Sequence, residues 1–220
     1  MSLIQRKPRP LDRENADFRD DRLFIVACDD TYAPKQYFSF FNLTRVQVHV
    51  VPTQDNSSVA QYVLGRLLEF DHEEDDELWM LLDTDHCIQA HHRKGFIQAI
   101  RDAKQRGVHV ALSKPCFELW LLLHFMDESV VVSLPNAKET EKALRKALGE
   151  YNKTHLKETD YPLDSIRDAC FRAEKLDATV AGGDIPETNT SRVYQLWKAI
   201  AAKALPSQLP DALKGLNKTK

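Results

Sequence analysis

The sequence is poor in cysteine, and its four cysteines are widely spaced. Cys28, Cys87, Cys116 and Cys170 form no Cys-x-x-Cys pair. This spacing argues against a zinc knuckle and against a disulfide framework. We therefore expect reduced, mostly buried thiols.

Two other features are missing from the chain. No apolar run is long enough to span a bilayer, and the start MSLIQRKPRP lacks the apolar centre of a secretory signal, so we expect a cytoplasmic protein with no membrane contact. The chain also lacks the Gly-x-x-x-x-Gly-Lys-Ser/Thr phosphate-binding loop, so an ATPase, if needed, must be another chain.

The chain has little excess charge of either sign. Its net charge of −3 gives no global attraction for nucleic acid, so nucleic-acid binding would need a local basic patch or a bridging metal. With 220 residues, of which 43% are apolar and 29% charged, the composition is that of a globular protein with a sizeable core. The oligomeric state stays open, with a homo-oligomer among the alternatives.

The most informative stretch is an apolar run that ends in two carboxylates. Residues 78–82 read LWMLL and are followed by Asp83, Thr84 and Asp85. A continuous apolar run suits a strand that is covered on both faces, as in a parallel sheet. In an extended chain Asp83 and Asp85 project to the same side, where Mg²⁺ is the natural occupant. The alternative is a strand that simply ends in a hydrophilic turn.

A second apolar run, residues 23–28, also ends in a carboxylate pair, Asp29 and Asp30. Further strands are predicted at 46–51 and 108–112, and helices at 35–43, 59–68, around 96–103 and 117–125. This alternation predicts an α/β fold with a mainly parallel sheet flanked by helices. Ligands of such sheets bind at the carboxyl edge, where both acidic pairs and the Ser113-Lys114-Pro115 turn fall.

The chain divides into four parts by composition. Residues 1–21 form a basic leader, which is either a flexible solvated tail or a nucleic-acid arm. The α/β core spans 22–135, a helical appendage of the same unit spans 136–205, and a tail spans 206–220. The appendage has predicted helices at 138–151, 163–177 and 191–204.

Residues 113–125, SKPCFELWLLLHF, closely resemble the signature of the RloB-like (abortive-infection AbiLii-type) family. The family also has an apolar strand ending in Asp-x-Asp, matched by Asp83 and Asp85, and a later Asn-Pro-Ser-like segment, matched loosely by residues 189–191. The resemblance covers about residues 23–197. The chain departs from the family where the usual Glu-Gly pair reads Asp29-Asp30.

The resemblance implies a Toprim-like fold and a metal-dependent nuclease that cuts RNA, such as tRNA, or DNA. Asp29, Asp83 and Asp85 would be ligands of Mg²⁺ or Mn²⁺ and catalytic residues, with Glu118 as an additional acidic member. Family members are common in bacterial antiviral defence and abortive infection, often beside an ATPase partner.

Other residues have weaker assignments. Ser113 and Lys114 are candidates for substrate contact, although a plain surface lysine is an equal alternative, and His124 is expected in the core. The alternative function is a catalytically impaired sensor or partner subunit of a defence complex. A third, binding of a small phosphorylated signal, has only the α/β architecture behind it.

Overall fold

A computed structural model describes residues 22–30, 32–53, 59–85, 90–181 and 183–216, so the predicted basic leader lies outside the described residues. Within these described residues, five strands form one sheet: β1 (Arg22–Cys28), β2 (Val46–Val51), β3 (Glu77–Asp83), β4 (His109–Lys114) and β5 (Thr190–Ser191). The order is β2-β1-β3-β4-β5, and only the pairing of β5 with β4 is antiparallel. The predicted α/β class with a mainly parallel sheet is confirmed, and the arrangement is consistent with a Toprim-like fold.

The central strands are buried on both faces, as their uninterrupted apolar runs predict. Alternate residues of β1 and β3 enter two different cores. Ile25 and Met80 belong to one core, and Phe24 and Trp79 belong to the other. The sheet is therefore the middle layer of three.

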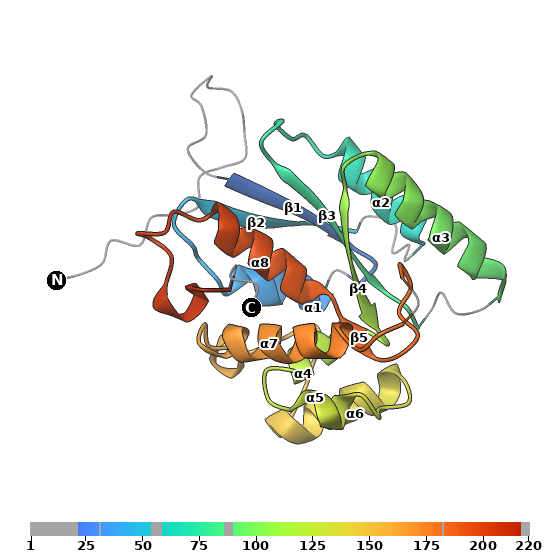
Figure 1. The fold of residues 1–220 in the computed structure, drawn as a ribbon, viewed down its shortest axis with the longest axis vertical. Coiled ribbons are helices and arrows are strands. Elements are labelled where there is room, and N and C mark those ends of the chain that lie inside the picture. The colour runs from blue at the N-terminus through green and yellow to red at the C-terminus, as the bar shows by residue number, and fades with distance from the viewer. Residues whose placement is uncertain (1–21, 31, 54–58, 86–89, 182, 217–220) are drawn as a thin grey trace.

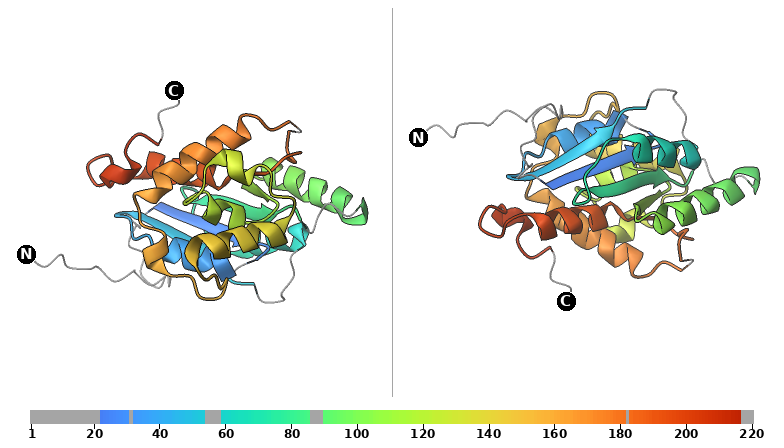
Figure 2. Two further views of the ribbon diagram at one scale, coloured as in Figure 1. Left: turned by 90° about the horizontal axis from the view of Figure 1, so that it is seen from below. Right: turned by 90° about the horizontal axis from the view of Figure 1, so that it is seen from above.

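Two helices cover one face of the sheet, α2 (Ala60–Glu69) and α3 (Ala90–Gln105) (Figure 1). The opposite face carries a thicker layer, seen from two sides in Figure 2. It comprises α1 (Tyr32–Ser39), α4 (Glu118–Leu122), α5 (Glu128–Val131), α6 (Ala137–Leu148), α7 (Ser165–Asp177) and α8 (Val193–Lys203), with the short 3-10 helices η1 (Glu158–Asp160) and η2 (Asp211–Leu213). Among the described helices, none has the length and apolar character needed to cross a membrane.

The helices after residue 136 share a core with the sheet. Trp197 of α8 is fully buried in the same cluster as Phe24 of β1, and Leu213 and Leu216 join them. Asn189 fixes the entry to β5, because its side-chain amide donates to the carbonyls of Val131 (3.0 Å) and Leu134 (2.6 Å). The C-terminal part thus completes both the sheet and its larger core.

Several of the described elements differ from the sequence-based expectation, which did not include the short helices α5, η1 and η2. Helix α1 begins earlier than predicted, because the side chain of Asp30 accepts a hydrogen bond from the amide of Tyr32 (2.9 Å) directly after β1. Helix α4 is shorter than 117–125, since its C-terminal end continues as tight i→i+3 turns through Phe125. Strand β5 was missed because two residues carry no periodicity.

Candidate active site

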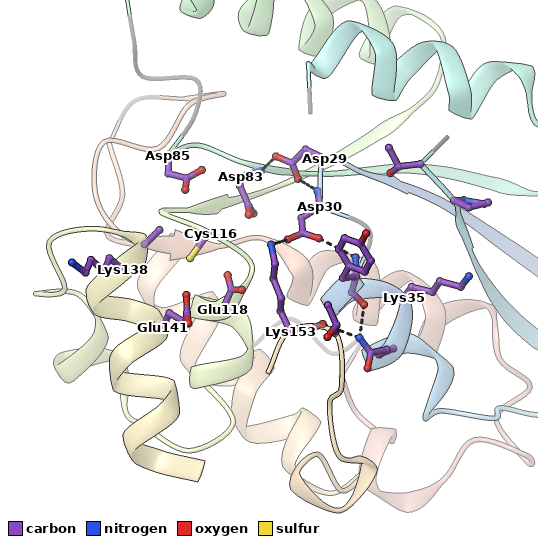
Figure 3. A pocket seen from close by; sticks show the side chains of 16 residues that line it. Asp29, Asp30, Lys35, Asp83, Asp85, Cys116, Glu118, Lys138, Glu141 and Lys153 are labelled. Atoms are coloured by element: carbon purple, nitrogen blue, oxygen red, sulfur yellow. Dashed lines mark hydrogen bonds and ion pairs between the residues drawn. The ribbon is translucent and has the colours of Figure 1, made fainter. Parts of the chain in front are cut away.

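The carboxyl ends of β1, β3 and β4 open into a cavity of about 800 Å³ (Figure 3). Its floor contains side chains that follow these strands, and its walls come from α1, α6 and the segment after α6. The lining residues are Asp29, Asp30, Tyr32, Lys35, Gln36, Pro52, Thr53, Asp83, Asp85, Cys116, Glu118, Ala137, Lys138, Glu141, Lys153 and Thr154. All four predicted catalytic carboxylates, Asp29, Asp83, Asp85 and Glu118, are therefore in one cavity.

Backbone hydrogen bonds hold the end of β3 against the end of β4. Asp83 is in register with Ser113. Beyond that pair, the amides of Thr84 and Asp85 both donate to the carbonyl of Pro115 at 3.1 Å. The two predicted ligands on β3 are thus carried by a backbone that is fixed on its β4 side.

Asp29 is held in place by the neighbouring backbone. Its Oδ2 accepts a hydrogen bond from the amide of Asp83 (2.8 Å), and its Oδ1 accepts one from the amide of Asp30 (2.9 Å). Figure 3 shows the carboxylate lying beside the start of the Asp83 side chain. Asp29 therefore joins the ends of β1 and β3.

The proton affinities of these carboxyl groups reflect burial and mutual repulsion. Burial raises the pKa of Asp29 to about 6, and the charge of Asp85 adds to this rise, while the two backbone amides oppose it. Burial also raises the pKa of Asp83 well above its usual range, with further increases from the charges of Asp29, Glu118 and Asp85. Bringing a cation into the cavity would relieve this repulsion.

Glu118 faces Asp83 across the cavity, and Cys116 lies near both. The hydroxyl of Tyr151, from the segment that follows α6, donates to Oε1 of Glu118 at 2.8 Å. Glu118 therefore has the partner that an acidic side chain in this apolar segment needs. Burial raises the pKa of the Cys116 thiol, so it stays protonated at neutral pH. Cys28 and Cys170 are also buried and free, as expected, and Cys87 lies outside the described residues.

The cavity is also lined by basic residues that were not among the site residues predicted from the sequence. Lys153 donates to Oδ2 of Asp30 at 2.8 Å, and Lys35 and Lys138 lie on the walls. Lys138 is in the helix that the sequence predicted at 138–151, but nothing local indicated which sheet edge it faces. The cavity thus combines acidic strand ends with a basic rim.

Ser113 and Lys114 do not line the cavity, and their side chains bind neighbouring parts of the chain instead. The hydroxyl of Ser113 is buried and pairs with that of Ser191 (2.9 Å), which joins β4 to β5. Lys114 donates to the carbonyls of Pro186 (3.1 Å) and Glu187 (2.8 Å). Both side chains serve the docking of the segment before β5.

The carboxylate oxygens in the cavity are suitable ligands for a hard divalent cation, although the side chains are not arranged as a complete coordination site. Within the described residues, no group of three or more histidine, cysteine, aspartate or glutamate side chains stands ready to hold a metal ion. Mg²⁺ commonly binds through only one or two carboxylates and retains several waters. Asp83 and Asp85 fit that mode, with Asp29 beside them.

The sequence that forms this cavity lies within a range that matches a known protein family. The family model described as RloB-like protein matches residues 24–200. The chain belongs to the RloB-like family. The matched range includes all five strands except the first two residues of β1, and every residue that lines the cavity. No curated protein and no solved structure matches the chain.

Proposed function

We propose that this RloB-like protein is a metal-dependent nuclease that hydrolyses phosphodiester bonds of RNA, such as tRNA, or DNA. The observation that carries the proposal is the cavity itself, in which Asp29, Asp83, Asp85 and Glu118 meet from three strand ends beneath a rim of lysines. Acidic ligands for a divalent cation beside basic contacts for phosphate are the parts that such a reaction needs.

The residues divide into three roles. Asp83 and Asp85 would hold Mg²⁺ or Mn²⁺, and Asp29 is either a shared ligand or the group that takes a proton from the attacking water. A bound ion would neutralise the scissile phosphate and favour formation of hydroxide from water. Glu118, oriented by Tyr151, faces Asp83 and completes the acidic floor.

The family relationship supports the biological setting of the proposal. We place the protein in bacterial antiviral defence or abortive infection, in the cytoplasm and together with an ATPase partner. The described chain contributes the cavity, and the sequence contains no ATP-binding loop of its own.

The first experiment is calorimetric titration with Mg²⁺ and Mn²⁺ of the wild type and of Asp83→Asn/Asp85→Asn, with folding checked by circular dichroism. We expect the wild type to bind and the variant to lose binding, and cleavage of RNA or DNA to be lost with it. Asp75→Asn/Asp211→Asn is the matched control, because it removes the same charge from exposed surface ion pairs.

A second candidate is a catalytically impaired sensor or partner subunit. It is favoured by the engagement of both residues that replace the family's Glu-Gly pair, since Asp29 accepts two backbone amides and Asp30 pairs with Lys153. A folded wild type that binds neither ion and cuts no nucleic acid, alone or with its partner, would replace the nuclease proposal with this one.

A further inference from the structure

One wall of the cavity carries an aromatic ring that the proposed chemistry does not use. Tyr32, Lys35 and Gln36 lie at i, i+3 and i+4 of α1, so they share one helix face, and all three line the cavity. The side chain of Tyr32 is 56% exposed despite its size. An exposed aromatic side chain beside basic groups is typical of a surface on which bases of single-stranded nucleic acid stack.

Lys153 stands next to this ring. Its ammonium is 6.0 Å from the centre of the Tyr32 ring, near the limit of a cation–π contact. It also donates to Asp30 at 2.8 Å (Figure 3). An ammonium has three donors, so the contact with Asp30 leaves capacity for a phosphate oxygen.

The segment that carries Lys153 is fixed to α1 by a two-point contact. The side-chain amide of Gln36 donates to the carbonyl of Lys153 (2.8 Å) and accepts from the amide of Leu156 (2.8 Å). The ring and the ammonium are therefore held at a set separation by elements that are far apart in sequence.

We propose that this wall is a subsite for an unpaired nucleotide of single-stranded nucleic acid, in which Tyr32 stacks on the base and Lys153 contacts the adjoining phosphate. A single strand exposes the faces of its bases, whereas a duplex keeps them stacked inside. The inference rests on the proposed nuclease function and specifies the form of nucleic acid that the cavity takes.

The test measures binding separately from cleavage. Fluorescence anisotropy in EDTA, at several salt concentrations, compares a labelled single-stranded RNA, the same sequence as DNA, and the corresponding duplexes. Tyr32→Leu removes the ring, Tyr32→Phe retains it, and Lys153→Met removes the ammonium. Tyr62→Leu is the control for the ring, because Tyr62 is 60% exposed on α2 and does not line the cavity.

Lys157→Met is the control for the ammonium. Lys157 lies four residues further along the same segment, has a side-chain exposure of 50% against 52% for Lys153, and pairs with Glu150 outside the cavity lining. The two substitutions thus remove the same charge from equally exposed side chains. Only one of them faces the proposed subsite.

We expect Tyr32→Leu to weaken single-strand binding by at least about fivefold and Tyr32→Phe to retain it. Lys153→Met should make the negative slope of log affinity against log salt less steep by about 0.7, and the controls should leave affinity and slope unchanged. Wild-type affinity in Tyr32→Leu, or a wild type that prefers the duplex, overturns the inference. If the wild type still cuts nucleic acid in Mg²⁺ in that case, the proposed function survives; a wild type that neither binds nor cuts removes both.

Discussion

At the scale of single residues, His124 is the clearest case of a titratable group held neutral by the fold. It is 7% exposed, with Nε2 3.0 Å from the hydroxyl of Tyr37 and Nδ1 2.7 Å from that of Ser165. Burial lowers the pKa of His124 to about 3, and the nearby charge of Arg172 adds to this. The expectation of a core histidine is confirmed.

This shift predicts acid sensitivity of a defined sign. In the unfolded chain His124 takes up a proton near pH 6.5, whereas in the folded protein it does so only near pH 3, so stability falls as pH decreases between these values. The loss from this residue is up to about 5 kcal/mol by the shift in pKa. The free energy of unfolding, measured with denaturant at pH 7, 5 and 4, tests this loss of stability.

His124→Asn cannot titrate and should show a flatter dependence of stability on pH than the wild type, although it is less stable at pH 7. His155→Asn removes an exposed histidine and serves as the control. An equally steep pH dependence in His124→Asn would assign the acid sensitivity to other groups.

Tyr151 is the second residue whose role is specific enough to test. Its hydroxyl donates to Glu118, so Tyr151→Phe should leave the ring in place and cost about 1 to 3 kcal/mol of unfolding free energy, as expected for a hydrogen bond to a charged group. Denaturant unfolding checks the cost. Because Glu118 lies in the acidic floor of the cavity, we also expect the Mg²⁺ affinity to change in Tyr151→Phe. Tyr62→Phe, on the exposed face of α2, should change neither the free energy of unfolding nor the Mg²⁺ affinity.

Among the secondary-structure elements, α6 forms one wall of the cavity. The helix is capped at its N-terminus by Asn136, whose side-chain oxygen accepts a hydrogen bond from the amide of Glu139 (3.0 Å), and it ends before Gly149, which has a φ of 81°. Lys138 and Glu141 reach the cavity from its first turns. The cap therefore influences both stability and the cavity wall.

We expect Asn136→Ala to destabilise the protein by about 1 kcal/mol, because the first turn loses its capping acceptor. Asn136→Asp keeps the acceptor and should stay close to the wild type. Thermal unfolding of the two variants measures these changes in stability. Equal destabilisation by both would show that the cap oxygen is not what stabilises α6.

At the scale of the whole molecule, the larger core joins segments from β1 to η2. Trp197 is fully buried in α8 and packs against Phe38 and Phe41, its ring centroids being 6.0 and 5.0 Å away. The C-terminal helices thus contribute the packing surface for the N-terminal half. We therefore expect the α/β core (22–135) and the helical appendage (136–205) to unfold together as one unit.

Trp197→Ala should destabilise the whole protein by about 3 to 5 kcal/mol, since a large side chain is removed from a packed core. Unfolding followed by circular dichroism and by fluorescence should give coincident single transitions in the wild type. Phe171→Ala, at a ring that is 60% exposed, should have little effect. Two separate transitions would show that residues 136–205 unfold independently.

Local sequence pattern was enough to predict the central strands and the acidic residues at their ends. Continuous apolar runs identified β1 and β3 because a strand buried on both faces has no polar alternation. The carboxylates that end them, Asp29 and Asp83, were placed at one sheet edge because parallel strands share a direction. The RloB-like signature around Glu118 identified the family.

The side chains that complete the cavity from distant parts of the chain could not be predicted, because their position depends on the packing of the folded protein. Tyr151 and Lys153 follow α6, and nothing in their local sequence indicates that they face the sheet edge. Lys153 meets Asp30 across 123 residues of chain. The same applies to Lys114, for which the sequence left open substrate contact or a plain surface position, and which the fold directs to the carbonyls of Pro186 and Glu187 before β5. Periodicity specifies which face of an element is buried, but the partner across that face is set by packing of the whole chain.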